Sequence, residues 1–199
     1  MNDNAKEFLA IARDFLIVGD KEDAYIHYAK VALDCDPQNS EAQFFMAVMS
    51  YNSLLNEKDY ASAVNAFTSM AMYLKNAVSD VKNSDLEPAA KRLIIKGMVE
   101  AYTPVTRFLF KGRISTTSST IQTGVRGLYN LGNAIKDNFD SDPAAMELAA
   151  VAWKEGVALQ REFYAYKYDG VNPEDYAAKI QKVEPSYVMP KKAGCVTIG

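Results

Sequence analysis

The fold of this chain is decided by residues 8–37, which read FLAIARDFLIVGDKEDAYIHYAKVALDCDP. The apolar residues of this stretch recur at helical spacing in two runs, and a Gly-Asp pair at 19–20 separates the runs. We predict one helix over about residues 5–18 and a second over about residues 21–33. Because so short a connection leaves no room for another geometry, the two helices are expected to be antiparallel.

A second helical hairpin is predicted over residues 40–82. Ser40 is expected to cap its first helix, with Gln43 three residues later as the reciprocal capping partner. The second helix should begin after the polar residues 57–59 and fade near residues 79–82. Its inner face carries four apolar residues at helical spacing, Tyr60, Ala63, Phe67 and Met70.

The first hairpin resembles the tetratricopeptide repeat, whose pattern is W-x2-L-G-x2-Y, then A-x3-F, then P. The matching residues are Phe8, Ile11, Ala12, Phe15, Ala24, Tyr28 and Pro37. One extra residue lies between the turn and Pro37, which departs from the pattern. The second hairpin resembles it more loosely, because Gln43 and Ser50 stand at the Trp and Tyr positions. The resemblance implies a right-handed α-α superhelix built from paired helices.

The sequence beyond residue 80 is helical but no longer repeat-like. Long apolar stripes at helical spacing predict helices from Pro88, over residues 121–139, and from Pro143 to about Tyr168, followed by a short helix after Pro173. We therefore predict an all-α fold of two tetratricopeptide-like helical hairpins packed on a C-terminal helical bundle. The expected boundaries are 1–80 for the hairpins, 81–183 for the bundle and 184–199 for an extended or disordered tail.

Composition and charge exclude several classes of function. The net charge of -3 and the pI near 5.3 create no positive field for phosphate backbones or anionic lipids, which argues against a nucleic-acid or membrane-surface partner. The two cysteines, Cys35 and Cys195, have neither disulfide-framework nor zinc-site spacing, which favours reduced thiols in a cytoplasmic protein. No stretch approaches the roughly 20 uncharged apolar residues of a membrane span.

Residues with catalytic or metal-binding potential are sparse. The single histidine, His27, is expected on the solvated face of its helix, without a partner for general-base chemistry. No motif for a metal, a phosphate loop or a cofactor occurs, so we expect no catalytic residues, no metal and no cofactor. Arg107, Lys111 and Arg113 lie before a Ser- and Thr-rich run, where they could bind an anion or simply stabilise the end of a helix.

The tetratricopeptide resemblance implies a non-catalytic protein-interaction module or scaffold, which binds a peptide or partner protein on a helical groove. The groove residues expected from this resemblance are Leu9, Arg13, Phe45, Met49 and Asn52. Members that bind chaperone carboxylates have Lys and Asn in such places, so that ligand is not expected here. The groove could equally be filled by the chain's own C-terminal helices.

A different class of function is also open. A helical enzyme or small-molecule-binding protein would have its site between the C-terminal helices, near Trp153, Tyr129 and Tyr164, where aromatic groups gather. The oligomeric state is expected to be a monomer or weak dimer, because the mixed charges of the first helix suit an end exposed to water. An enclosed pocket would favour the enzyme, whereas an open groove would favour the interaction module.

Overall fold

The computed structural model describes residues 2–110, 118–163 and 171–192. Every regular element in these ranges is a helix, which confirms the predicted all-α class. In chain order the elements are α1 (Asp3–Val18), α2 (Lys21–Lys30), the π-helix η1 (Val31–Cys35), α3 (Ser40–Asn56), α4 (Tyr60–Lys82), α5 (Pro88–Phe110), α6 (Ser118–Phe139), α7 (Pro143–Glu162) and α8 (Pro173–Val183).

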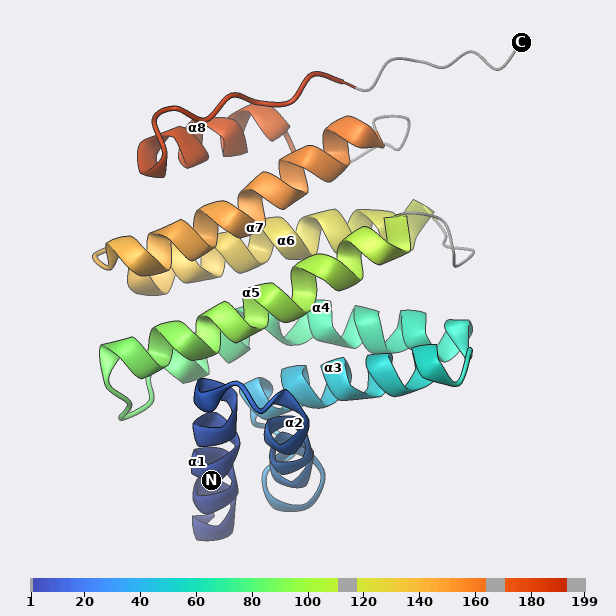
Figure 1. Cartoon of the computed structure of the whole chain (residues 1–199), viewed down its shortest axis with the longest axis vertical. Coiled ribbons are helices and arrows are strands. Elements are labelled where there is room, and N and C mark those ends of the chain that lie inside the picture. Colours follow the sequence, from blue (N-terminus) through green and yellow to red (C-terminus); the bar gives the residue numbers. More distant parts are fainter. Residues whose placement is uncertain (1, 111–117, 164–170, 193–199) are drawn as a thin grey trace.

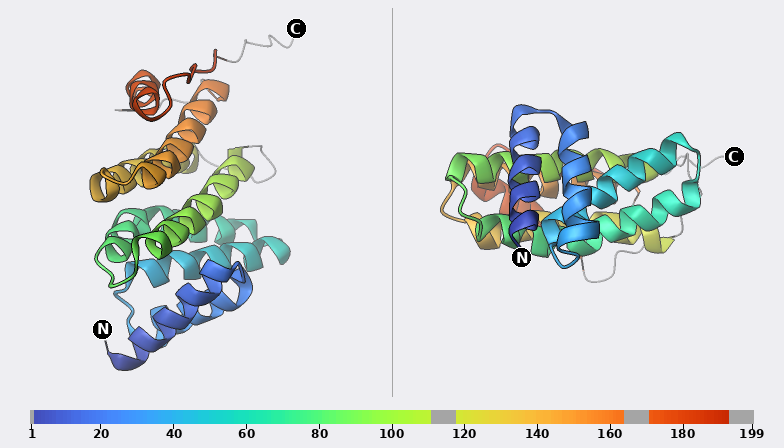
Figure 2. Two further views of the ribbon diagram at one scale, coloured as in Figure 1. Left: turned by 60° about the vertical axis from the view of Figure 1, so that its left-hand side comes forward. Right: turned by 90° about the horizontal axis from the view of Figure 1, so that it is seen from below.

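The helices form successive layers along the long axis of the molecule (Figures 1 and 2). The α1–α2 hairpin lies at one end, α3 and α4 follow, and α5 with α6 form the middle. At the other end lie α7, α8 and the segment after α8. Neighbouring layers are joined because α4 packs on α6 and α5 packs on α7.

The two predicted N-terminal hairpins are present, but they run in different directions. Helices α1 and α2 lie side by side, and they point across the direction of α3 and α4 in both figures. The first hairpin meets the second mainly through α2 and α3, and α1 also reaches α5. This crossing opens a concave corner between α1, the start of α3 and the chain that joins α4 to α5.

The extra residue before Pro37 is accommodated by a change in helix type. After Lys30 the helix widens from α to π geometry and forms η1. The backbone amide of Asp36 there donates to the carbonyl of Val31, five residues earlier, at 2.7 Å. A π-helical turn holds one more residue than an α-helical turn, so it can absorb a single additional residue without breaking the helix. The second helix therefore continues to Cys35 rather than ending near Leu33.

The start of α3 corrects one predicted cap. Asn39, rather than Ser40, is the capping residue, and its side chain accepts from the amide of Ala42 at 2.8 Å. Gln43 does not close a capping box, because its side-chain amide donates to the carbonyls of Ala32 and Pro37. It ties α3 to the preceding loop instead.

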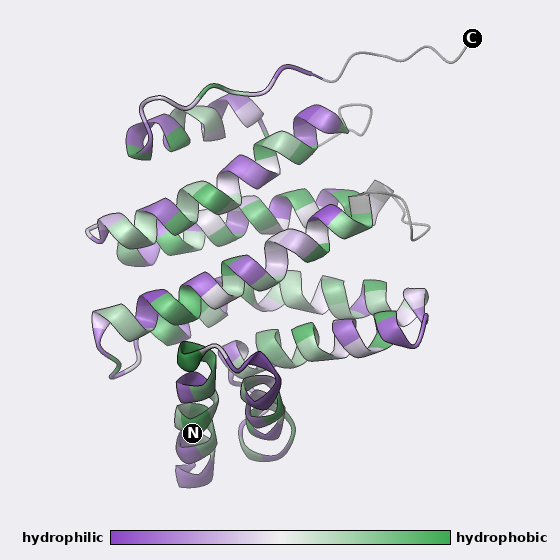
Figure 3. Ribbon diagram, in the orientation of Figure 1, coloured by the Kyte–Doolittle hydropathy of each residue, from purple (hydrophilic) through white to green (hydrophobic). Residues whose placement is uncertain are grey.

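One continuous hydrophobic core runs through all the layers. Ala12 and Ala24 are fully buried, as expected for small residues where two helices meet closely, and Tyr28 is buried beside them. Trp153 fills the core near the other end. Hydrophobic and hydrophilic residues alternate along the helices in Figure 3, which is the pattern of amphipathic helices that share such a core.

The C-terminal part differs from the prediction at two boundaries. Helix α7 ends at Glu162 rather than near Tyr168, and residues 164–170 lie outside the described part of the chain. Residues 184–192 form no helix or strand and include a turn at residues 185–186, and the half-buried side chains of Tyr187 and Met189 pack against the hydrophobic core. The remainder of the predicted tail, residues 193–199, also lies outside the described residues.

Candidate functional site

An open cleft of about 560 Å³ lies in the corner between the two crossed hairpins. Its walls come from α1, from residues 36–39 before α3, and from the C-terminal end of α4 with the α4–α5 connection. Most of the lining residues carry polar side chains, among them carboxylates, amides, a lysine and an arginine, and two leucines, Leu9 and Leu86, complete the lining. Such a lining offers a ligand both polar groups and apolar surface.

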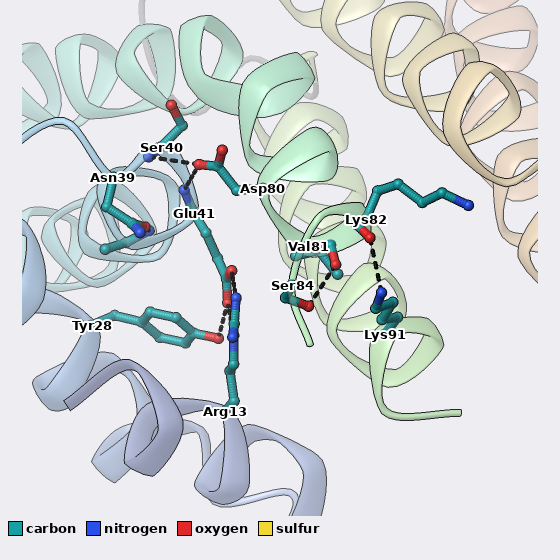
Figure 4. A network of polar contacts seen from close by, with 11 residues as sticks. Arg13, Tyr28, Asn39, Ser40, Glu41, Asp80, Val81, Lys82, Ser84 and Lys91 are labelled. Atoms are coloured by element: carbon teal, nitrogen blue, oxygen red, sulfur yellow. Dashed lines mark hydrogen bonds and ion pairs between the residues drawn. The ribbon is translucent and has the colours of Figure 1, made fainter. Parts of the chain in front are cut away.

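A buried ion pair forms the floor of the cleft (Figure 4). The guanidinium of Arg13 on α1 donates two hydrogen bonds to the carboxylate of Glu41 on α3, at 2.9 and 2.7 Å. The phenol of Tyr28 on α2 donates to the same carboxylate at 2.9 Å, and Glu41 is 0% exposed. Three helices are thereby joined at one carboxylate, which fixes the shape of the cleft floor.

The pKa values of this cluster follow from burial and charge. Burial alone would lower the pKa of the Arg13 guanidinium, but the hydrogen bonds and the charge of Glu41 raise it. The pKa of the Tyr28 phenol lies well above its usual range, because the side chain is buried and faces the negative charge of Glu41. Arg13 and Tyr28 are thus held in their protonated forms and stabilise the Glu41 carboxylate.

A second carboxylate meets the start of α3 from a different helix. Asp80, near the end of α4, accepts hydrogen bonds from the backbone amides of Ser40 at 3.0 Å and Glu41 at 3.4 Å. Figure 4 shows the Asp80 carboxylate directed at these amides. A carboxylate at this place is favoured by the unpaired amides and the partial positive charge of a helix N-terminus. Asp80 therefore joins the second hairpin's two helices at the edge of the cleft.

The pKa of the Asp80 carboxyl is nevertheless raised. Partial burial raises it most, and the negative charge of Glu41 adds to that effect. The two backbone hydrogen bonds and the charge of Arg13 act in the opposite direction but do not outweigh it. The ionised form of Asp80 is therefore less stable at the edge of the cleft than it would be in water.

The residues predicted to line a single partner-binding groove are separated in the structure. Leu9 and Arg13 line the cleft, but Leu9 is only 3% exposed and Arg13 is bound to Glu41. Phe45 is fully buried and stacks on Tyr28, with ring centroids 4.4 Å apart. Met49 is half-buried and Asn52 is exposed, and both lie further along α3. The burial of Leu9 and Phe45 corrects the expectation that these side chains present a surface to a partner.

His27 is also placed differently from the prediction. It is half-buried against α1, with its ring centroid 6.2 Å from that of Phe8 and 5.4 Å from that of Phe15. Its Nδ1 lies 2.9 Å from the backbone carbonyl of Asp23. The ring packs between α1 and α2 rather than standing free in water.

The aromatic residues of the alternative C-terminal site pack against their neighbours. Trp153 is 0% exposed, and its indole lies against Gly132 so closely that a Cβ there would be 2.3 Å from Nε1. The Tyr129 ring stacks on Tyr176 with a centroid distance of 3.7 Å. Tyr164, the third residue of that predicted site, lies outside the described residues.

The basic residues near the end of α5 are described only in part. Arg107 donates two hydrogen bonds to the carboxylate of Glu155 on α7, at 2.6 and 2.7 Å. This ion pair joins α5 to α7 and neutralises the charge of Arg107. Lys111 and Arg113 lie outside the described part of the chain.

Within the described ranges, no group of three or more His, Cys, Asp or Glu side chains is arranged to hold a metal ion. None of the described helices combines the length and the apolar character that crossing a bilayer requires. Comparison with family models, with curated proteins and with solved structures found no match to this chain.

Proposed function

We propose that this chain is a non-catalytic protein-interaction module, which binds a peptide segment of a partner protein in the cleft between α1 and the α4–α5 connection. The observation that carries the proposal is the cleft itself, about 560 Å³ of open concave space lined by side chains from three separate parts of the chain. Its polar groups could bind the backbone and side chains of an extended peptide, while the half-buried Leu86 offers apolar contact.

The rigidity of the cleft supports binding. The Arg13–Glu41 pair and the contact of Asp80 with the start of α3 fix its floor and its edge before any ligand arrives. A preformed site loses less conformational entropy on binding than a site that must first be ordered. The cleft therefore offers affinity without requiring a large rearrangement of the helices.

The tetratricopeptide resemblance of the first hairpin supports the same class of function. Proteins of that kind present concave helical surfaces to peptides or partner proteins. The proposed site differs in position from the groove expected from the resemblance, because the first hairpin lies across the second. Fold-level likeness names no partner, so the cleft lining has to supply the specificity.

The proposal is tested by selecting peptides from a random display library on the full chain and measuring their affinity by fluorescence anisotropy. Asn83 lines the cleft and is exposed, so an Asn83→Trp substitution should occupy the space without disturbing the core. Asn76→Trp, on an exposed position of α4 outside the lining, is the matched control. We expect tenfold or greater loss of affinity with Asn83→Trp and none with Asn76→Trp. Selected peptides that bind both variants equally, or a selection that yields none, would contradict the proposal.

A further inference from the structure

Resting on the proposed function, we infer that the partner segment carries a basic side chain, an arginine or a lysine, which binds in the cleft beside Asp80. The charges of the cleft carry this inference. Three carboxylates line it, Asp36, Asp80 and Asp85. Two basic side chains, Lys6 and Arg13, line the same space.

The charge of Arg13 is already matched within the protein. Its guanidinium donates two hydrogen bonds to Glu41, in the parallel arrangement that arginine and a carboxylate prefer. Glu41 also accepts from Tyr28, so this buried group forms a neutral unit with its partners. Arg13 therefore offers little net positive charge to a ligand.

The charge of Asp80 is not matched in the same way. One of its oxygens, Oδ2, accepts both amide hydrogen bonds from the start of α3, where the helix supplies only about half a unit of positive charge. Glu41 acts on Asp80 with a like charge and Arg13 with an opposite one, but these two groups are paired with each other, so neither neutralises Asp80. A ligand cation in the cleft would supply the missing opposite charge.

The mouth of the cleft adds further negative charge. Asp85 is exposed on the α4–α5 connection and Asp36 is half-buried beside the start of α3. Lys6 also lines the cleft, and its ammonium group lies 3.3 Å from the carboxylate of Asp3 on its own helix. An acidic ligand would face these carboxylates and bind poorly, whereas a basic one would gain from all of them.

The apolar part of the lining suits the stem of a basic side chain. Lysine and arginine carry three or four methylene groups that bind along apolar surface while the charged end stays among polar groups. The half-buried Leu86 lines the cleft together with the carboxylates, so both kinds of contact are available to one side chain. Leucine alone at that position of the ligand would leave the carboxylates unmatched.

The inference is tested with four synthetic pools of capped peptides, about nine residues long, that share a degenerate uncharged background and differ at one central position, arginine, lysine, leucine or glutamate. Each pool is titrated onto the full chain at low and at near-physiological salt, because exposed ion pairs weaken with salt. We expect the arginine or lysine pool to bind at least tenfold more tightly than the glutamate pool.

Two variants of the chain locate the effect. Asp80→Asn keeps a hydrogen-bond acceptor for the amides of α3 but removes the charge, and it should reduce the preference for the basic pools about tenfold. Asp175→Asn, at an exposed position of α8 at the other end of the molecule, changes the net charge equally and should leave the preference unchanged.

The outcomes separate the inference from the proposed function. If the leucine or glutamate pool binds as tightly as the basic pools, or if Asp80→Asn keeps the full preference, the inference is wrong while peptide binding in the cleft stands. If no pool binds and the display selection also yields nothing, the proposed function and the inference both fail.

Discussion

Arg13 and Glu41, which are 28 residues apart in the chain, form a bidentate ion pair that joins α1 to α3 across the floor of the cleft. The side chain of Glu41 is 0% exposed and that of Arg13 is 11% exposed. Two charges this deeply buried lose most of their hydration, so the pair is favourable only while both partners are present.

Replacing one partner of this pair should destabilise the protein severely. Arg13→Met keeps an unbranched apolar side chain but leaves the Glu41 carboxylate buried, with Tyr28 as its remaining side-chain donor. We expect the free energy of unfolding to fall by about 3–5 kcal/mol, the usual cost of an uncompensated buried charge. Urea denaturation followed by circular dichroism measures the change.

The second substitution of the pair provides the control. Adding Glu41→Gln to Arg13→Met removes the stranded charge and should restore part of the lost stability. Lys21→Met breaks a pair with Glu100 in which both side chains are about half exposed, and it should cost less than about 1 kcal/mol. An Arg13→Met protein as stable as the Lys21→Met protein would contradict the importance of the buried pair.

Asp80 should give the protein a specific pH dependence. Folding raises the pKa of its carboxyl above the usual 3.8, first through burial and then through the charge of Glu41. The stabilising contribution of the protonated group is fully present below the unfolded pKa and is lost as the pH rises through the folded pKa. Relative to Asp80→Asn, the natural protein should therefore lose stability as the pH is raised from acid toward neutral.

The quantity to be measured is the difference in the free energy of unfolding between the natural protein and Asp80→Asn at each pH. Other carboxylates titrate in both proteins, so their effects largely cancel in that difference, which urea midpoints measure across the acid range. Asp80→Ala removes the acceptor as well as the charge, and it should be less stable than Asp80→Asn by about 1 kcal/mol at all pH values, the usual cost of losing a helix cap. A difference that stays constant with pH, or that favours the natural protein more as the pH rises, would show that the Asp80 pKa is not raised.

Much of the N-terminal fold could be predicted from local pattern. The apolar spacing and the Gly19 stop predicted the first helices, and Gly19 adopts a left-handed conformation with φ 91° at the end of α1. Ala12, Ala24 and Tyr28 are buried, as their places in the repeat pattern require. The crossing of the two hairpins could not be predicted, because it depends on packing between helices that the pattern of each hairpin does not encode.

The site could be predicted only in small part. Arg13 was expected at a binding surface and does line the cleft, but its partner Glu41 reads in the sequence as an ordinary acidic residue in the first turn of a helix. Asp80 likewise reads as the polar end of α4. Their meeting at the start of α3 depends on the tertiary arrangement, and no local spacing signals it. The burial of Phe45 was missed for the same reason, because Tyr28 comes from another helix.

The oligomeric state stays a prediction, and we expect a monomer or weak dimer. Among the described residues, the most exposed large apolar side chains include Val18 on α1, Leu33 on η1 and Met72 on α4, which lie on different elements. Singly exposed apolar residues of this kind are normal on a monomeric protein. Multi-angle light scattering over a range of concentrations should give the mass of one chain, or an average that rises slowly with concentration. A higher oligomer whose mass does not change on dilution would contradict this expectation.

Gly132 tests how tightly the C-terminal core is packed. A Cβ at this position of α6 would lie 2.3 Å from Nε1 and 2.5 Å from Cδ1 of Trp153, whose indole is 0% exposed. Gly132→Ala gains about 1 kcal/mol of helix propensity, but forcing the indole aside in a packed core costs about 1–3 kcal/mol. We expect a net fall in the free energy of unfolding together with a shift in the emission of Trp153, which is the sole tryptophan.

Gly97→Ala is the matched control on α5. The nearest atom to a Cβ there is Cδ2 of Leu16 at 3.2 Å, at the end of a flexible side chain that can move by a few tenths of an ångström. The same propensity gain should then leave this variant as stable as the natural protein or more stable by up to about 1 kcal/mol. Urea denaturation of both variants, followed by Trp153 fluorescence, gives the two values side by side. Equal stability of the Gly132→Ala and Gly97→Ala proteins would mean that α6 and α7 separate readily, and that the indole of Trp153 is not locked in the core.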